Sequence, residues 1–529
     1  QRYEDGFEAL WRGEQLNTMT LSVPSETYET ISKLSVGKEA FTDEEKYVKY
    51  GELYNNFFNV DHPINIPFVP ENINGKTFAI YGHQRKAIQS WISNAYKGIL
   101  QLSTGSGKTI TSIYALTKVY EKRKRAKLNT VLIVSVPYQE LAKQWVDNLQ
   151  EFNIYPVKCW RSKSEWHSDL KNNITDLKMG VKDFFAIVVV NRTMENNEFK
   201  IQLEKINRDE KFFIGDECHN HGSSITNSSL PDAYYRLGLS ATPFRADNDE
   251  VDSLFPNEAK TRILDYYKTI AAEYSLGDAI NDGVLCEYNY HIIPVYLDEA
   301  EEEEYEYLSK EIGKLISGAA SEKNSSSSGK FTALCGKRSR LLGGAKGKLV
   351  ALRELLRGYP MADRKHSLFY CGECSYLLEE DDLYNSKIIE SVSKELNLAG
   401  WVASQFTSNE NHAERSLIMD NFIAGSIDAL VSMKVLDEGV DVPVCNKAFI
   451  LSSTRNPRQY IQRRGRVLRK SLGKEYADIY DFVILPRNNS LSSQSLRRAE
   501  LGRIDDFILL ARNRFDAEVV VDKLKLRND

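Results

Sequence analysis

Cysteine is scarce in this chain, which has 7 cysteines among 529 residues, at irregular spacing. This scarcity excludes a disulfide framework and favours a reducing compartment. Long hydrophobic runs are lacking as well, because the longest, such as TVLIVSV and FFAIVVV, have the length of strands and are too short to span a bilayer. Since no signal peptide is visible either, the sequence predicts a cytoplasmic protein.

An excess of positive charge is also missing, since the net charge is −5 and the pI is near 6.1. General electrostatic binding of nucleic acid is therefore excluded, and any such contact needs a local groove. The contents of 42% hydrophobic and 27% charged residues are typical of a soluble globular protein. A chain of this length is expected to form two to four domains.

Strand-like runs alternate with helical patterns in two separate parts of the chain, residues 76–250 and 346–486. Such alternation predicts an α/β fold with two parallel sheets in tandem, each covered by helices on both faces. Residues 251–345 contain an acidic helical run and the serine-rich stretch SEKNSSSSGK, which together predict an insertion with a flexible linker. The flanking parts are an N-terminal accessory region, 1–75, and a helical tail, 487–529.

The stretch LQLSTGSGKTITSIYAL (100–116) places a glycine-rich turn between an apolar run and a helical pattern. This arrangement is typical of a phosphate-binding loop, in which backbone N–H groups and the helix N-terminus face the phosphates. We expect Lys108 to pair with the β- and γ-phosphates of ATP and Thr109 to offer its hydroxyl to Mg²⁺. Leu102 stands where the strict pattern begins with glycine, and a plain surface turn is the alternative. The expected loop comprises Thr104, Gly105, Ser106, Gly107, Lys108 and Thr109.

The stretch IGDECHN (214–220) allows two metal interpretations. A zinc site needs about four ligands, and the adjacent residues Cys218 and His219 have poor geometry for sharing one ion. In the other interpretation Asp216 helps to hold Mg²⁺ and Glu217 polarises the attacking water of a nucleotide hydrolase. The phosphate-binding loop upstream favours magnesium.

An ordered series of segments between residues 76 and 485 resembles helicase superfamily 2, in its DExH variety. The segments are YGHQRKAI (81–88), VPYQELAKQW (136–145), VVVNRTM (188–194), GLSATP (238–243), FYCGE (369–373), VSMKVLDEGVDVP (431–443) and QYIQRRGRVLR (459–469). Their texture is similar to that of DNA translocases of the restriction-motor and XPB-like group. The resemblance implies two tandem RecA-like lobes with an ATP site between them.

The resemblance also implies roles for single residues. Gln84 is expected to read adenine, Gly439 and Asp441 to meet the nucleotide, and Arg466 and Arg469 to act as arginine fingers. The residues expected to couple ATP to movement are His219, Ser240 and Thr242. The nucleic-acid contacts expected from position in these segments are Arg192, Thr193, Ser432 and Lys434.

The sequence therefore predicts an ATP-dependent nucleic-acid helicase or translocase that uses ATP and Mg²⁺. DNA is the expected polymer, bacterial anti-phage defence or DNA repair the expected context, and a nuclease a candidate protein partner. Two alternatives stay open at this point. One is a DExH RNA helicase, and the other is an ATP-gated, nucleic-acid-binding switch that controls a partner without unwinding.

Overall fold

A computed structural model describes residues 65–73, 75–244, 256–319, 326–372, 388–407, 410, 412–432, 444–452, 457–471 and 473–524. The chain divides into two units, residues 1–64 and 65–529, and all described residues belong to the second. Among the described helices, none is long and apolar enough to cross a membrane.

The first lobe is built on a parallel sheet of seven strands, in the order β5-β6-β4-β7-β8-β3-β9. Three neighbouring strands, β6, β4 and the central β7, are buried along their whole length, as their near-continuous apolar sequences predict. The strands are β3 (Lys97–Leu102), β4 (Thr130–Val136), β5 (Val157–Cys159), β6 (Phe184–Val190), β7 (Lys211–Asp216), β8 (Tyr235–Ser240) and β9 (Ile270–Tyr274).

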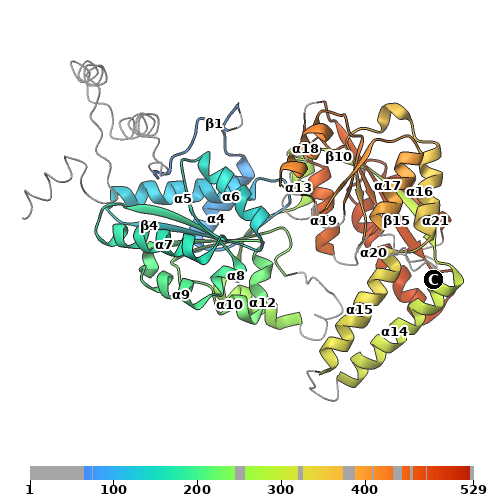
Figure 1. The fold of residues 1–529 in the computed structure, drawn as a ribbon, viewed down its shortest axis with the longest axis horizontal. Helices are drawn as coiled ribbons and strands as arrows, with labels where there is room; N and C mark the ends of the chain where they lie inside the picture. The colour runs from blue at the N-terminus through green and yellow to red at the C-terminus, as the bar shows by residue number, and fades with distance from the viewer. Residues whose placement is uncertain are drawn as a thin grey trace, which may run out of the picture. The chain divides into compact units, whose positions relative to one another are not determined.

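Helices cover both faces of this sheet (Figure 1). Successive strand residues face opposite sides, so Leu132 and Val134 pack in one core while Val131 and Ile133 pack in the other. One face is covered by α4 (Gly82–Ser93), α5 (Lys108–Arg125) and α6 (Gln139–Gln150). The other is covered by α7 (Lys163–Lys178), α9 (Asn197–Glu204) and α12 (Pro256–Tyr267). Shorter elements are β1 (Asn72–Ile73), β2 (Lys76–Thr77), α8 (Asn191–Met194), η1 (Arg208–Glu210), η2 (Cys218–Gly222) and α10 (Ser224–Asn227).

The second lobe has a parallel sheet of six strands, in the order β10-β15-β14-β11-β13-β12. Its strands are β10 (Glu287–Tyr296), β11 (Ser367–Tyr370), β12 (Ala403–Phe406), β13 (Ala429–Ser432), β14 (Lys447–Ile450) and β15 (Tyr476–Leu485). One face packs on α16 (Gly347–Arg357) and α17 (Ile388–Leu398). The other packs on α18 (His412–Ile423), α19 (Pro457–Val467), α20 (Leu491–Ile508) and α21 (Arg514–Lys523). The prediction of two parallel-sheet lobes is confirmed.

The structure divides the part between the lobes differently from the sequence prediction. Residues 251–345 were expected to form a separate insertion, but β9 is the edge strand of the first sheet and β10 is that of the second. The burial along β10 alternates, which is a weaker sequence signal than the continuous apolar run of a central strand. The serine-rich stretch is helical from Ser326 onward. What remains between the two strands is α13 (Leu276–Asn281), and beyond β10 come α14 (Glu299–Ala319), α15 (Ser326–Gly343) and the short turn η3 (Met361–Asp363).

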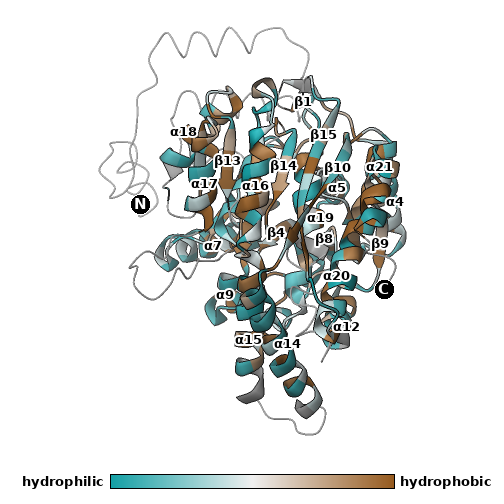
Figure 2. Cartoon of the chain, turned by 90° about the vertical axis from the view of Figure 1, so that its right-hand side faces the viewer, coloured by the Kyte–Doolittle hydropathy of each residue, from teal (hydrophilic) through white to brown (hydrophobic). Residues whose placement is uncertain are grey.

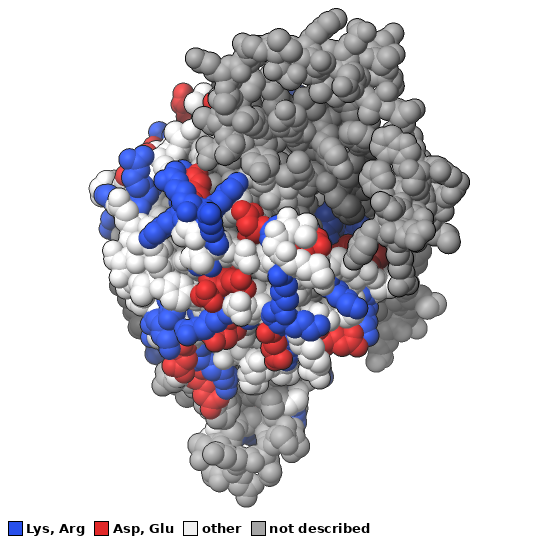
Figure 3. All heavy atoms as spheres, turned by 90° about the vertical axis from the view of Figure 1, so that its left-hand side faces the viewer, with Lys and Arg blue, Asp and Glu red and all other residues white. Residues whose placement is uncertain are grey.

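Hydropathy and charge follow this architecture. Figure 2 shows apolar residues concentrated in β13 and β14 and in the inner faces of their helices, whereas α14 and α15 are largely hydrophilic. On the face of the first lobe shown in Figure 3, lysine and arginine are interspersed with aspartate and glutamate. This mixture agrees with the small net charge of the chain. Any contact with nucleic acid on this face must therefore depend on individual basic residues and not on a broad positive surface.

Candidate active site

The phosphate-loop sequence lies between β3 and α5, as the sequence predicts. Gly107 caps α5 at a φ of 82°, and a Cβ there would lie 2.5 Å from Nε2 of Gln84, so only glycine fits. The ammonium of Lys108 donates to the carbonyl oxygens of Leu102 and Ser103, at 3.1 and 3.3 Å. Burial lowers the pKa of Lys108, and the charges of Glu217 and Asp216 raise it in opposition.

Gln84, the residue expected to read adenine, is almost fully buried against this loop. Its Nε2 donates to the carbonyl oxygens of Ser106 and Gly107, at 3.3 and 3.4 Å. Its Oε1 accepts from the backbone N–H of Tyr81 at 3.0 Å. In this structure the Gln84 amide therefore holds the phosphate-loop backbone in place.

Asp216 ends β7 and is held by two donors. The indole Nε1 of Trp145 donates to Oδ2 at 2.7 Å, and the backbone N–H of Glu217 donates to Oδ1 at 3.0 Å. Burial, and then the neighbouring Glu217 carboxylate, raise the pKa of Asp216 to about 6, while the Trp145 hydrogen bond and the Lys108 charge lower it. A carboxyl group poised in this way is typical of a functional site. Trp145 has no role in the sequence prediction.

Glu217 adopts a left-handed backbone conformation, with φ 46° and ψ 51°. A non-glycine residue held in this region costs of order 1–3 kcal/mol, and such strain clusters at functional sites. The strained turn leads directly to His219, whose Nδ1 lies 3.3 Å from Oε2 of Glu217 and 3.3 Å from Oγ of Ser240. Oγ of Ser240 accepts from the backbone N–H of Thr242 at 3.1 Å. His219, Ser240 and Thr242, the residues expected to couple ATP to movement, are thus linked by successive hydrogen bonds.

The zinc interpretation of this turn finds no support in the geometry. Cys218 is buried in the apolar core with α7 and α12, whereas His219 faces Glu217 and Ser240. Within the described residues, no group of three or more His, Cys, Asp or Glu side chains is arranged to hold a metal ion. The two side chains therefore have separate structural surroundings.

The second lobe brings α19 against the phosphate loop. A Cβ on Gly465 would lie 2.7 Å from Cβ of Thr104, and a Cβ on Gly105 would lie 3.4 Å from Cγ of Arg469. The charges of Arg469 and Arg466 lower the pKa of Lys108, which places both guanidinium groups within electrostatic range of its ammonium. Arg469 therefore lies at the loop that it is expected to serve, and Arg466 lies near enough for its charge to act on Lys108.

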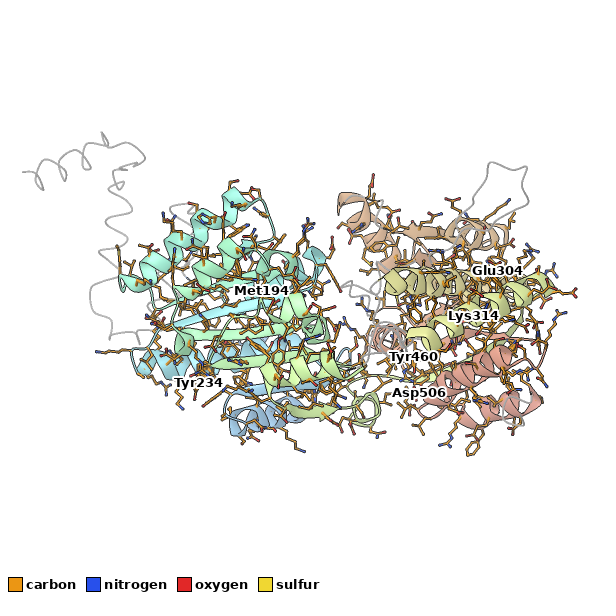
Figure 4. The ribbon with its side chains drawn as sticks, turned by 90° about the horizontal axis from the view of Figure 1, so that it is seen from below. Met194, Tyr234, Glu304, Lys314, Tyr460 and Asp506 are labelled. Carbon is orange, nitrogen blue, oxygen red and sulfur yellow. The ribbon has the colours of Figure 1, made fainter. Side chains whose placement is uncertain are left out.

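The tail helix α20 anchors α19. The hydroxyl of Tyr460 donates to Oδ2 of Asp506 at 2.6 Å, and Figure 4 labels both residues in this part of the second lobe. Arg464 donates to the backbone oxygen of Asp506 at 2.8 Å and to the hydroxyl of Tyr288 at 3.2 Å. The tail thereby fixes α19, which carries Arg466 and ends two residues before Arg469.

The expected nucleic-acid contacts fall into different environments. Arg192 is exposed and Thr193 half-buried on the short helix α8, next to the buried Met194 that Figure 4 labels in the first lobe. Ser432 ends β13 and is fully buried, so its side chain does not face solvent. Lys434, and with it Gly439 and Asp441 of the expected nucleotide contacts, lie outside the described residues.

A pocket of about 760 Å³ opens beside the phosphate loop, and most of the residues that line it belong to no segment with a role expected from the sequence. The imidazole of His83 stacks on the ring of Tyr274 with centroids 4.0 Å apart, and its Nε2 lies 3.0 Å from the carbonyl oxygen of Ser106. The ring of Tyr81 lies nearly parallel to that of His83, with centroids 5.8 Å apart, and Tyr274 donates to Asp282 at 3.0 Å. Flat rings beside a phosphate loop suit a nucleotide base. The only feature of the sequence that points to this pocket is that His83 directly precedes Gln84.

Comparisons with known proteins agree with this site. A family model described as "Type III restriction enzyme, res subunit" matches residues 77–245, and one described as "Helicase conserved C-terminal domain" matches residues 348–471. A virus protein that carries the name helicase 22, from Sulfolobus islandicus filamentous virus, is 22% identical over 77% of this chain. The "DNA 3'-5' translocase XPB2" of Sulfurisphaera tokodaii is 24% identical over 78% of this chain. The matches span 65% and 82% of those two proteins.

A solved structure shares the fold over nearly the whole chain. It is described as "ATP-dependent Type ISP restriction-modification enzyme LlaBIII bound to DNA", with a TM-score of 0.53 and 14% identity. The likeness covers 94% of this chain and 36% of that one, so this chain corresponds to about a third of the larger enzyme. Together with the two family matches, these relatives identify the chain as a superfamily 2 helicase related to the XPB-like helicases and to restriction-enzyme motors.

Proposed function

We propose that the chain hydrolyses ATP between its two lobes and uses the energy to move along DNA. The observation that carries this proposal is the meeting of charged groups from three parts of the fold: Lys108 at the start of α5, the acid pair Asp216 and Glu217 at the end of β7, and Arg466 of α19 with Arg469 just beyond that helix. Phosphoryl transfer needs positioning and charge stabilisation, and these groups supply both.

The residues around the loop fit a phosphate and a divalent cation. Oγ of Ser103 is buried and has no hydrogen-bond partner among the described residues. We assign Mg²⁺ to Thr109 and Asp216, and when bound it neutralises charge on the phosphates. Glu217 orients the attacking water. Arg466 and Arg469 stabilise charge on the transferred phosphoryl group, which makes hydrolysis depend on contact between the lobes.

We assign the base of the nucleotide to the pocket beside Gln84. The rings of His83 and Tyr274 offer flat apolar surfaces for stacking, and the pocket adjoins the loop through the contact between His83 and the carbonyl oxygen of Ser106. Gln84, held by that loop, then links the base pocket to the phosphates. His83→Ala should raise the KM for ATP more than it lowers kcat, because stacking on the base stabilises bound ATP and the transition state equally.

DNA is the proposed polymer because the XPB-like relative is named as a DNA translocase, and Arg192 and Thr193 are its proposed contacts in the first lobe. The decisive experiment compares ATP hydrolysis in the presence of single-stranded DNA, duplex DNA, forked DNA and RNA at one salt concentration. Stimulation by DNA supports the proposal. Strong stimulation by single-stranded RNA with none by duplex DNA would favour a DExH RNA helicase instead.

A displacement assay separates a motor from a switch. A translocase should displace a paired strand or a triplex-forming strand in the presence of ATP, and Lys108→Ala should abolish both displacement and hydrolysis because it removes the charge that pairs with the phosphates. Normal hydrolysis without displacement would instead support an ATP-gated switch that controls a partner.

The biological setting is proposed to be bacterial anti-phage defence or DNA repair, with a nuclease as the protein partner. A plating assay tests the defence role directly, because phage titres on cells that carry the wild-type gene are compared with titres on cells that carry Glu217→Gln. Equal titres on the two strains would argue against defence.

A further inference from the structure

A second histidine of the DECHNH stretch, His221, lies fully buried behind the candidate ATP site. It belongs to η2, and its Nδ1 lies 2.8 Å from the hydroxyl of Tyr267 on α12. Its Nε2 lies 3.5 Å from Oγ of Ser135 at the end of β4, and that hydroxyl donates to Oδ1 of Asn191 at 2.7 Å. These four polar side chains, which come from four elements, form one buried series of hydrogen bonds, here called the His221 chain.

The hydrogen bonds of this chain can run in only one direction. Burial lowers the pKa of His221 to about 3, so its imidazole is neutral and carries a single N–H. The one hydroxyl hydrogen of Ser135 goes to the side-chain oxygen Oδ1 of Asn191, so Oγ must accept from Nε2–H of His221. Nδ1 therefore accepts from Tyr267, whose hydroxyl donates. The chain fixes one tautomer and one orientation of the ring.

The Tyr267 end of the His221 chain packs against Gly215, the residue that precedes the acid pair. A Cβ on Gly215 would lie 2.1 Å from the hydroxyl of Tyr267 and 2.5 Å from Cε1 of His221. The residue that precedes Asp216 must therefore be glycine for the chain to pack there. Any shift of the end of β7 is transmitted to the imidazole, because dense packing leaves no space to absorb it.

The other end reaches the short helix α8. Asn191 is its first residue, and it is followed by Arg192 and Thr193, the proposed DNA contacts. A second link joins the same two regions, since Oγ1 of Thr226 on α10 donates to Oε1 of Glu195, the C-cap of α8, at 2.8 Å. The segment that follows the acid pair is therefore linked to both ends of α8, directly through Thr226 and by way of Ser135 through His221.

We propose that His221 is a positioning residue that couples the ATP site to the DNA-contacting helix α8, through Ser135 and Asn191. The proposal rests on the proposed function, since it concerns how DNA stimulates hydrolysis. DNA on α8 sets the position of Asn191, and the chain passes that position to Gly215 and the acid pair. By reciprocity, nucleotide at the acid pair changes the affinity of α8 for DNA.

Ser135→Ala tests the coupling because it breaks the chain next to α8 without touching the ATP site. We expect basal hydrolysis and the KM for ATP to stay unchanged, whereas the DNA-stimulated kcat falls ~5–10-fold, within the usual range of coupling between sites. Ser135→Thr, which keeps the hydroxyl, should retain stimulation. Tyr267→Phe removes a single hydroxyl at the far end and should give a smaller loss of the same kind.

Ser367→Ala is the matched control, because Ser367 is also fully buried and hydrogen-bonded but starts β11 in the other lobe. A wild-type protein that no DNA stimulates overturns the proposed function and the coupling with it. A stimulated wild type whose Ser135→Ala variant is stimulated equally overturns the coupling alone. The coupling is likewise refuted if Ser135→Ala loses basal and stimulated hydrolysis in equal proportion, because the damage is then structural.

Discussion

Replacing Trp145 with phenylalanine removes the indole donor from Asp216 but keeps an apolar ring in the core. A hydrogen bond to a charged group contributes ~1.5–3 kcal/mol, which corresponds to a rise of ~1–2 in the pKa of that carboxyl. Since the pKa of Asp216 is already about 6, its ionised fraction at pH 7 should fall from ~0.9 to between ~0.5 and ~0.1. Because only the carboxylate holds Mg²⁺, half-maximal hydrolysis should need ~2–9-fold more Mg·ATP.

The pH dependence distinguishes this cause from general damage. Hydrolysis is measured against Mg·ATP at pH 6.5, 7 and 8.5 for the wild type, Trp145→Phe and Trp91→Phe. Trp91 is also a buried indole, but it donates to the backbone oxygen of Arg236 on β8 and not to a carboxylate of the acid pair. The Trp145→Phe deficit should widen at pH 6.5 and shrink to within ~1.3-fold at pH 8.5, where Asp216 is ionised in both proteins. A deficit that is equal at all three pH values, or that Trp91→Phe shares, would refute the reasoning.

Three further substitutions test the remaining parts of the site. Glu217→Gln should keep nucleotide binding, measured by a fluorescent ATP analogue, but should stop phosphate release, and unchanged turnover would contradict its role with water. Arg469→Ala should lower kcat by ~10³-fold or more with little change in ATP affinity, and a loss confined to affinity would speak against a finger. Gly465→Ala should lower hydrolysis because its Cβ meets Thr104, whereas Gly502→Ala, with open space around a helical glycine, should leave hydrolysis unchanged, and equal activity of the two variants would exclude the interlobe contact.

The parts of the site that the sequence predicts are those whose signals are local. The phosphate loop is recognisable because one short stretch must supply a strand, a glycine turn and a helix start. The acid pair is recognisable because an apolar strand ends in two carboxylates, and parallel strands end at the same edge of a sheet. The two tandem lobes are recognisable because each contributes its own series of apolar strands to a parallel sheet.

The parts that the sequence does not predict depend on contacts between distant residues. Trp145 lies 71 positions before Asp216, too far away for a local sequence pattern to link the two residues. Tyr274 meets His83 because β9 returns to the edge of the first sheet, and the alternating character of an edge strand hides that return. The burial of Ser432 depends on β11 and β12, which pair on either side of its strand.

Hydrogen bonds within the protein engage the groups that we expect to bind the nucleotide and its cation. Lys108 donates to two carbonyl oxygens where phosphate oxygens are expected, and the Asp216 carboxylate accepts from the backbone N–H of Glu217 where a cation is expected. Binding therefore exchanges hydrogen bonds within the protein for bonds to the nucleotide, and the net gain is smaller than the sum of the new contacts. The exchange also moves the groups that made the internal bonds. Since Asp216 adjoins Gly215, and Gly215 packs on the His221 chain, this motion has a defined route toward α8.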